Sequence, residues 1–155
     1  MIEDKLQELG FTLPTVPKPV ANYLPAKRYG QLILTAGQLP FVHGELTKTG
    51  RIGEDLTVTE GQQQARLAVL NALAAVHSLH PHWHDLEILR MTGYLQTSST
   101  FTDHADVLNG ASDFLVHLFG EKGRHARTAI GMYTLPKNSP VEIELMVMVK
   151  ESNDR

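Results

Sequence analysis

A cluster of charged side chains marks a candidate site in the segment GEKGRHARTAIG, residues 120–131. The segment supplies Lys122, Arg124, His125 and Arg127 at a point where a loop leads into a predicted strand. An arginine at the start of a strand presents a rigid guanidinium, which can hold a carboxylate through two parallel hydrogen bonds. The segment therefore predicts a site for a small carboxylate, anchored by Arg127.

The next predicted strand carries two acidic residues, Glu142 and Glu144. We expect the short turn PKNSP to join the two strands as an antiparallel hairpin, which would bring a glutamate near Arg127. A carboxylate in that place can orient a water molecule or act as a general base. An ordinary ion pair at the strand edge explains the same spacing more simply, so both interpretations stand at this point.

Four histidines lie within the eight residues HSLHPHWH, at the end of a predicted helix. Imidazole is a common ligand of Zn²⁺. Pro81 interrupts the helix, however, so these histidines do not share a regular helical face, and Asp85 is the acidic residue that accompanies them. We therefore expect a solvent-exposed connector rather than a metal site, and it contains His77, His80, His82 and His84.

Composition and missing motifs exclude several other classes of protein. The chain has no cysteine, which excludes a disulfide scaffold, an iron–sulfur site and a thiol nucleophile. No GxSxG elbow, P-loop, post-strand GxGxxG or paired HxE and CxxC signature is present. With 14 basic against 17 acidic residues, the net charge of −3 does not suit a nucleic-acid partner.

The length of 155 residues suits a single domain. Within it, residues 1–19 are expected to form an N-terminal helix and a proline-rich arm. No run approaches the ~18–20 apolar residues that a membrane span needs, and the acidic N-terminus lacks the apolar stretch of a signal peptide. We therefore expect a cytoplasmic protein with no membrane partner, to which the absence of cysteine adds support.

Hydrophobic periodicity predicts the elements that must position the candidate residues. Predicted strands cover residues Val20–Tyr23, Gln31–Gly37, Leu86–Thr97, Arg127–Leu135 and Val141–Lys150. Predicted helices cover Ile2–Leu9, Thr59–His80 and Asp103–Phe119. Thr59 and Gln62 resemble a capping box at the start of the long helix. The glycine-containing segment 41–56 predicts a loop with one short hairpin at most.

Without the first helix the order is ββαβαββ, which favours an α+β two-layer sandwich with both helices on one face of the sheet. The last strand alternates an apolar face with a face that carries Glu142 and Glu144. Apolar residues expected on the uncovered face are Ile33, Leu89, Met91, Met146 and Met148. We expect a second subunit to bury them, although singly exposed apolar residues are the alternative.

Three segments together resemble the YjgF/RidA family, also known as L-PSP endoribonuclease-like. LTAGQLP, after an upstream tyrosine, resembles the family's SGQIP strand, and QQARLAVLNALAAV resembles its first helix. HARTAIGMYTLPKNSPVEIELMVMV resembles its closing motif PARxxVxVxxLPxxxxxEIEAIAV. The match covers roughly Val20–Val149, in the family's order, and NGASDFL and RHARTAIG resemble a divergent bacterial subgroup. The resemblance implies a chorismate-mutase-like fold with a mixed sheet, and a homotrimer with ligand clefts between subunits.

The resemblance also implies an activity. Well-known family members hydrolyse reactive enamine and imine intermediates to 2-oxo acids and ammonia, with no metal or organic cofactor. The resemblance implies that Arg127 holds the substrate carboxylate and that Glu142 contacts substrate or water. The remaining positions that it assigns to substrate binding are Tyr23, Gly37, Asn109 and Ala129.

Three positions depart from the family's pattern. Ala129 stands where the deaminase subgroup has a cysteine, and Ala36 replaces the serine of SGQ. The asparagine of the second helix aligns with Leu108, and Asn109 follows one residue later. Two functions therefore stay open: an imine deaminase with a different substrate, or a non-catalytic trimer that binds small carboxylates. The endoribonuclease name fits poorly, because the acidic chain lacks a basic stripe interleaved with aromatics.

Overall fold

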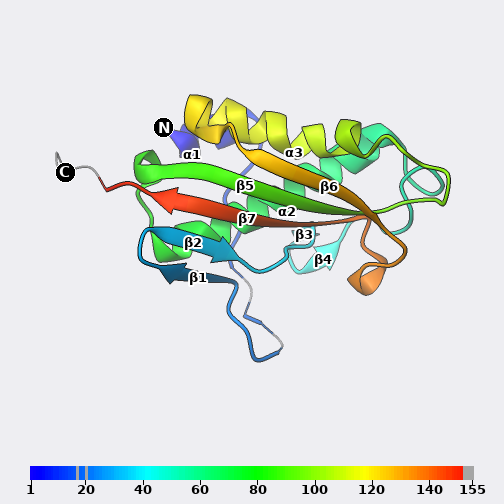
Figure 1. Ribbon diagram of the computed structural model, residues 1–155, viewed down its shortest axis with the longest axis horizontal. Coiled ribbons are helices and arrows are strands. Elements are labelled where there is room, and N and C mark those ends of the chain that lie inside the picture. Colours follow the sequence, from blue (N-terminus) through cyan, green and yellow to red (C-terminus); the bar gives the residue numbers. More distant parts are fainter. Residues whose placement is uncertain (17, 20, 152–155) are drawn as a thin grey trace.

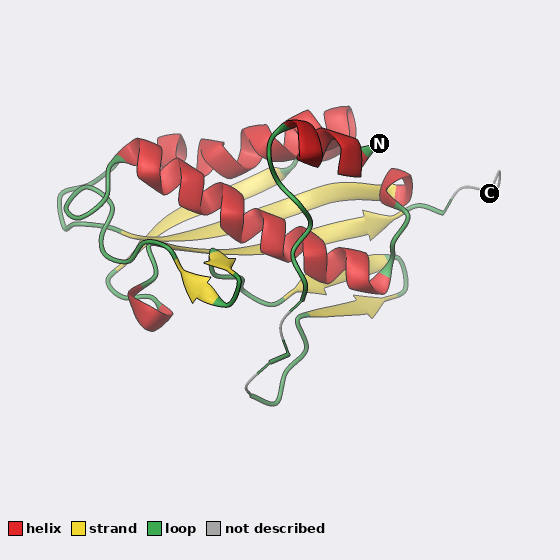
Figure 2. Ribbon diagram, turned by 180° about the vertical axis from the view of Figure 1, so that it is seen from behind, coloured by secondary structure: helices red, strands yellow, loops and turns green. Residues whose placement is uncertain are grey.

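Five strands form a mixed sheet, and two long helices lie across one of its faces (Figures 1 and 2). The computed structural model describes residues 1–16, 18–19 and 21–151. The helices are α1 (Ile2–Glu8), α2 (Val58–Leu79) and α3 (His104–Phe119). The sheet contains β1 (Ala26–Tyr29), β2 (Leu32–Thr35), β5 (Leu86–Gln96), β6 (Ala126–Met132) and β7 (Val141–Val149). A separate hairpin pairs β3 (Phe41–Val42) with β4 (Glu45–Leu46), and short 3-10 turns cover Trp83–Asp85, Gly120–Gly123 and Pro136–Asn138.

The strand order is β1-β2-β7-β5-β6, so the last strand in the chain lies in the centre of the sheet. β7 pairs antiparallel with both β2 and β5, whereas β6 pairs parallel with β5. The parallel pair follows from α3, because a helix that connects two neighbouring strands of one sheet brings the second back in the same direction. The predicted β6–β7 hairpin is therefore wrong: β5 lies between those two strands.

The predicted fold class is confirmed: an α+β sheet of mixed direction carries α2 and α3 on one face. The edge strand expected at Val20–Tyr23 is instead β1, Ala26–Tyr29, after the last proline of the arm. Residues 21–23 of that prediction form a bend, and Val20 lies outside the described residues. The short hairpin expected within 41–56 is confirmed as β3–β4.

Helix α2 begins one residue before its predicted start, and its N-cap lies two residues before the predicted one. The capping box consists of Thr57 and Glu60, not Thr59 and Gln62: Thr57 Oγ1 accepts from the Glu60 N–H at 3.1 Å. In return Glu60 Oε1 accepts from the Thr57 N–H at 3.0 Å. Lys48 and the Thr57 backbone lower the pKa of Glu60 to about 2, so this cap carries its charge at neutral pH.

The two faces of the sheet differ in burial as the alternation of β7 predicts. Residues of β7 alternate strictly between buried and half-buried, and the buried set faces α2 and α3. On the other face Leu32 lies opposite Met148, and Leu34, 46% exposed, lies opposite Met146. Ile130 on β6 is similarly exposed, at 45%. This uncovered face is thus partly apolar.

Two residues expected on the uncovered face lie in the core instead. Ile33 and Met91 are fully buried. β5 contains a register shift between Ile88 and Arg90, where Leu89 is the additional residue. A bulge of this kind reverses the face that later residues present, which places Met91 under the helices. Leu89 itself is half-buried.

One buried cluster of apolar residues extends from Ile2 in α1 to Val149 in β7. The N-terminal segment joins it through Phe11, whose ring meets Phe114 of α3 edge-on at 5.5 Å between centroids. Among the described helices, none is both long and apolar enough to cross a membrane.

The two long helices approach each other closely at Gly110. A Cβ atom added there would lie 2.4 Å from the backbone oxygen of Gln62 in α2. Such a distance requires the backbone of one helix to move, because no side-chain rotation can relieve it. Glycine at this position therefore sets the spacing of the helix layer above Arg127.

We expect Gly110→Ala to destabilise the fold by about 1–3 kcal/mol, the typical cost of overpacking a well-packed contact. The comparison is Gly61→Ala in α2, where the added Cβ meets side-chain carbons of Val107 and Ile52 at 3.0 and 3.2 Å. The side chains of Val107 and Ile52 can shift, so Gly61→Ala should lose less stability than Gly110→Ala. Urea unfolding of both variants measures the difference, and equal midpoints would contradict the close contact at Gly110.

Candidate functional site

Arg127 lies near the start of edge strand β6 and faces the helix layer. It pairs in register with Met91, which is fully buried on that face. Arg127 Nη1 donates to Asn109 Oδ1 at 2.8 Å and to Ser112 Oγ at 3.0 Å, and Nη2 donates to the Ala105 carbonyl at 3.3 Å. All three acceptors are uncharged and come from α3. The described residues include no carboxylate paired with this guanidinium.

The structure brings the predicted residues Asn109 and Ala129 to the same side as Arg127. Ala129 is two residues further along β6 and packs against the core. Leu108, the residue that aligns with the family's asparagine, is fully buried and covers Gly93 of β5. Asn109, one residue after Leu108, is half-buried and accepts a hydrogen bond from Arg127. An asparagine therefore contacts Arg127 even though the aligned position is a leucine.

Ser112 is a contact of Arg127 that the sequence interpretation did not include. It lies one helical turn after Asn109, and residues at this spacing share a helix face. Ser112 Oγ lies 2.9 Å from His125 Nε2, and His125 Nδ1 lies 2.6 Å from the Gly123 carbonyl oxygen. The i, i+3 spacing within α3 was the signal that could have identified it.

Glu142 lies on the uncovered face. It pairs in register with Tyr94 of β5, and Tyr94 is an odd number of residues after the buried Met91, so the two face opposite sides of the sheet. It is half-buried, and burial together with the charge of Glu144 raises the pKa of Glu142 above its usual range. Glu144 accepts from the Tyr94 hydroxyl at 2.7 Å. Gly37 leaves room for Glu142, since a Cβ at Gly37 would lie 2.9 Å from the carboxyl carbon.

Tyr23 lies in the segment before β1 and is exposed. It lines a shallow hollow of about 480 Å³ with Lys27, Leu34 and Ala36, the residue before Gly37. The predicted substrate-binding residues therefore form two groups. Asn109, Arg127 and Ala129 lie on the helix side, whereas Gly37 and Glu142 adjoin each other on the uncovered face near the Tyr23 hollow.

A single chain does not bring Arg127 and Glu142 together. Their side chains project from opposite faces of the sheet, with β5 between their strands. The predicted proximity is wrong, and so is the alternative of a strand-edge ion pair between them. The cause is the position of β7, which the short PKNSP segment before that strand does not reveal.

The connector with the four histidines is partly buried and not wholly solvent-exposed as expected: His80 and Asp85 are buried, whereas His82 and His84 are exposed. His80 Nε2 lies 2.7 Å from Asp85 Oδ2, and Arg28 Nη1 lies 3.3 Å from His80 Nδ1. The ring of His77 stacks on Trp83. Within the described ranges, no group of three or more His, Asp or Glu side chains is arranged to hold a metal ion.

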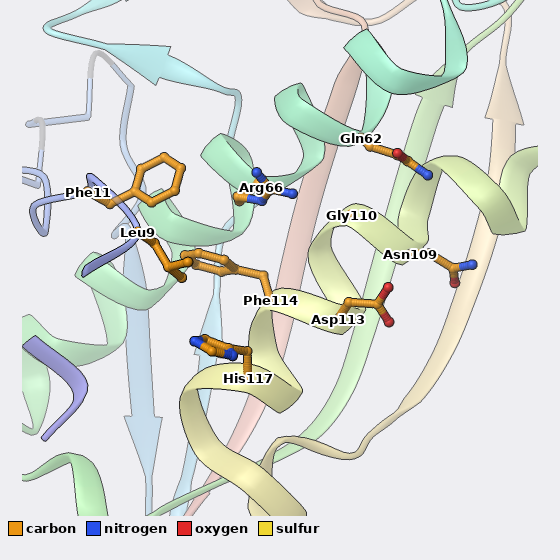
Figure 3. A pocket seen from close by; sticks show the side chains of 9 residues that line it. All are labelled: Leu9, Phe11, Gln62, Arg66, Asn109, Gly110, Asp113, Phe114 and His117. Carbon is orange, nitrogen blue, oxygen red and sulfur yellow. The ribbon is translucent and has the colours of Figure 1, made fainter. Parts of the chain in front are cut away.

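A second hollow, of about 290 Å³, lies on the outer surface where α2, α3 and the segment after α1 meet (Figure 3). Phe11 and Phe114 form its apolar wall, and the Arg66 guanidinium lies over the Phe114 ring at 5.9 Å. Asn109 lines it as well, so the hollow adjoins the helix that holds Arg127.

The protein is thus an α+β sheet with two helices on one face and an arginine held at the sheet edge. Comparisons with known proteins show which family has this architecture. The family model described as "YjgF/chorismate mutase-like, putative endoribonuclease" matches residues 3–149. Protein TCP17 of Trypanosoma cruzi is 37% identical over 147 residues, covering 92% of this chain and 90% of that protein. The chain belongs to the YjgF/chorismate mutase-like family.

Two solved structures agree closely in fold. The protein Atu1372 of Agrobacterium tumefaciens, described as having unknown function, is 38% identical with a TM-score of 0.90, over 96% of this chain and 92% of that one. A "putative endoribonuclease" from Shewanella oneidensis MR-1 is 35% identical with a TM-score of 0.92, over 96% of this chain and 99% of that one. The family and fold that the sequence resemblance predicted are confirmed.

The raised pKa of Glu142 leads to a stability prediction. The folded state disfavours the charged form of the Glu142 carboxyl. This loss of folding stability is therefore absent in acid, and it develops as the pH rises through the pKa that Glu142 has in the folded protein. Glu142→Gln should therefore be more stable than the parent at pH 7 and close to it at pH 4. Thermal unfolding at both values and one protein concentration measures this.

The matched control is Glu87→Gln on the same face. Glu87 lies 2.8 Å from Lys150, and this contact lowers the pKa of Glu87. The Lys150 contact stabilises the fold at pH values above the pKa that Glu87 has in the unfolded chain, and this stabilisation is lost in acid. Glu87→Gln should therefore be less stable than the parent at pH 7. A Glu142→Gln variant that behaved like Glu87→Gln would contradict a disfavoured charge at Glu142.

Proposed function

We propose that this protein hydrolyses reactive imine or enamine intermediates of amino acids to 2-oxo acids and ammonia. The observation that carries this proposal is the half-buried Arg127, whose three contacts are all with neutral acceptors. A partly desolvated cation without an anionic partner favours an anion from outside the chain. The guanidinium has more N–H donors than these contacts use, so it can still receive a carboxylate.

The proposed chemistry asks little of the site beyond positioning. An imine carbon is already electrophilic, so the protein must hold the substrate, deliver water and move protons. Arg127 would hold the substrate carboxylate. Glu142 would orient the attacking water, a role that suits a carboxyl whose pKa is raised by burial. The reaction needs no redox group and no carrier cofactor.

Because Arg127 and Glu142 face opposite sides of one chain, we propose that the site forms between copies in a homotrimer. Arg127 would come from the β6 edge of one copy, and Tyr23, Gly37 and Glu142 would come from the β1–β2–β7 region of the next. The partly apolar uncovered face, with Leu34, Ile130 and the two methionines of β7, supports burial against other copies.

A non-catalytic role is the second candidate. Ala129 and Leu108 put apolar groups where the family's deaminases have polar ones, and both pack against the core. A protein that only binds small carboxylates would keep Arg127 without those groups. Calorimetric titration with 2-oxo acids separates the two functions, because binding without turnover supports the second. RNA cleavage is not proposed, since the chain has a net charge of −3.

Arg127→Lys should reduce imine hydrolysis by about 100-fold, because a point charge cannot reproduce the bidentate geometry that places the substrate. Arg127→Ala should lose at least as much. Imino acids generated in place by an amino-acid oxidase, with semicarbazide as competitor, provide the assay. Arg124→Lys is the matched control: Arg124 is exposed, lies three residues earlier and pairs with Glu121. If the wild-type protein accelerates hydrolysis of none of several imino acids, the proposal fails.

The shared site predicts complementation between two inactive variants. Arg127→Ala and Glu142→Gln, unfolded and refolded together, should regain activity that neither shows alone. In a random equal mixture about a quarter of the interfaces in a cyclic assembly combine an intact Arg127 with an intact Glu142. Native mass spectrometry should give three times the 17.2 kDa of the chain. A monomeric mass, or a mixture as inactive as its components, would overturn the shared site.

A further inference from the structure

Ser112 and His125 form a hydrogen-bonded pair beside the proposed carboxylate anchor. Ser112 projects from the middle of α3, and His125 lies immediately before β6. Ser112 Oγ is 2.9 Å from His125 Nε2 and 3.0 Å from Arg127 Nη1. Both side chains are half-buried, so the pair is neither sealed in the core nor free in solvent. Figure 3 shows the stretch of α3 from which Asn109 and Asp113 project.

The partners of this pair determine where its protons lie. The Gly123 carbonyl, 2.6 Å from His125 Nδ1, can only accept, so Nδ1 carries the hydrogen. In the neutral ring Nε2 is then an acceptor that faces the Ser112 hydroxyl. Arg127 can only donate, so it uses a lone pair of Ser112 Oγ and leaves the hydroxyl hydrogen for His125. This is the arrangement in which a histidine can take a proton from a serine.

We propose that Ser112 and His125 are the proton relay of the Arg127 site. The inference rests on the proposed imine hydrolysis and specifies how its protons move. Ser112 is the group that would contact the reacting atoms, and His125 acts through it. In a 2-imino acid the imine carbon is bonded directly to the carboxylate carbon. A carboxylate held by Arg127 therefore places the imine close to the hydroxyl that contacts the same guanidinium.

The relay accounts for every proton of the reaction. In the first step the water oxygen bonds to the imine carbon, one water proton passes to Ser112 as the serine proton passes to His125, and the imine nitrogen receives a proton from the relay. The product is a carbinolamine. In the second step the carbinolamine hydroxyl gives its proton to the relay, the nitrogen receives one, the C–N bond breaks, and ammonia and the 2-oxo acid leave. The relay ends as it began.

A charged residue contacts the pair directly, and others lie beside it in the sequence. Arg127 of β6 contacts Ser112 directly, and Asp113 follows Ser112 on α3. The segment that leads to His125 contains the remaining neighbours in sequence, which are Glu121, Lys122 and Arg124. Asn109 contacts Arg127 without carrying charge, so it can orient the anchor but cannot exchange protons in this reaction.

The test is the kinetics of His125→Gln and Ser112→Ala with imino acids generated in place. Loss of a general acid–base group should lower kcat by about 100-fold, with a small change in KM because Arg127 still binds the carboxylate. The pH dependence of kcat should differ between the wild type and His125→Gln, because the variant lacks the group that exchanges protons with Ser112. Ser112→Thr keeps the hydroxyl and should restore most of kcat. His117→Gln, also on α3, and Ser78→Ala at the end of α2 are the controls.

The outcomes separate the relay from the function on which it rests. An active wild type whose His125→Gln variant keeps kcat and the wild-type pH profile overturns the relay alone. A variant that raises KM with kcat unchanged shows that the pair only orients Arg127, which also overturns it. A wild type that hydrolyses none of the imino acids overturns the deaminase proposal and the relay together.

Discussion

The insertion of β7 between β2 and β5 is the constraint on which the rest of the structure depends. β7 must satisfy backbone hydrogen bonds on both edges and bury alternate side chains beneath α2 and α3. Its inward side chains are Val141, Ile143, Leu145, Val147 and Val149, all buried. Because the strand fills the centre, β6 is displaced to the edge, and Arg127 becomes accessible from outside the sheet. The same alternation sends Glu142 and Glu144 to the uncovered face.

This arrangement leaves two opposite charges incompletely satisfied within one chain. Arg127 has only neutral partners, and Glu142 is half-buried next to a second carboxylate. They cannot compensate each other, because the sheet separates them. A cyclic assembly that seats the β6 edge of one copy on the uncovered face of the next would bring the two kinds of charge together. A bound carboxylate and a water molecule between them would then satisfy both, which is the geometry that the proposed hydrolysis requires.

Local pattern predicted much of the fold, and long-range pairing accounts for most of the errors. Periodicity placed α3 and β7 to within a residue or two, because buried residues recur at helical spacing along α3 and at every second position along β7. The β6–β7 pairing was wrong because a short turn does not show that another strand lies between its two ends. Met91 was assigned to the wrong face because a single bulge at Leu89 reverses the parity of the strand. Thr57 and Thr59 both begin a capping-box pattern, and only the fold distinguishes them.

The candidate site was predictable where residue type alone carries the chemistry. Arg127 was identified from its residue type at the start of a predicted strand, Asn109 was identified from the family pattern, and the two are in contact. Ser112 was missed because its i, i+3 spacing from Asn109 becomes informative only once Asn109 is known to contact Arg127. His125 was noted only as a charged neighbour of Arg127, since its tautomer depends on the Gly123 carbonyl. The Ser112–His125 pair is therefore defined by tertiary contacts that spacing in the sequence does not reveal.

The departures from the family's pattern explain why the proposed proton transfer uses Ser112 and His125. Ala129 has no group that can exchange a proton, and Leu108 is buried over Gly93. Of the three groups of the described chain that contact the guanidinium, the Ala105 carbonyl and the Asn109 amide do not titrate in water. The Ser112 hydroxyl is the third, and by itself it is a weak base. It can exchange protons at neutral pH only because His125 accepts its hydrogen, so the histidine before β6 supplies what the alanine within β6 does not.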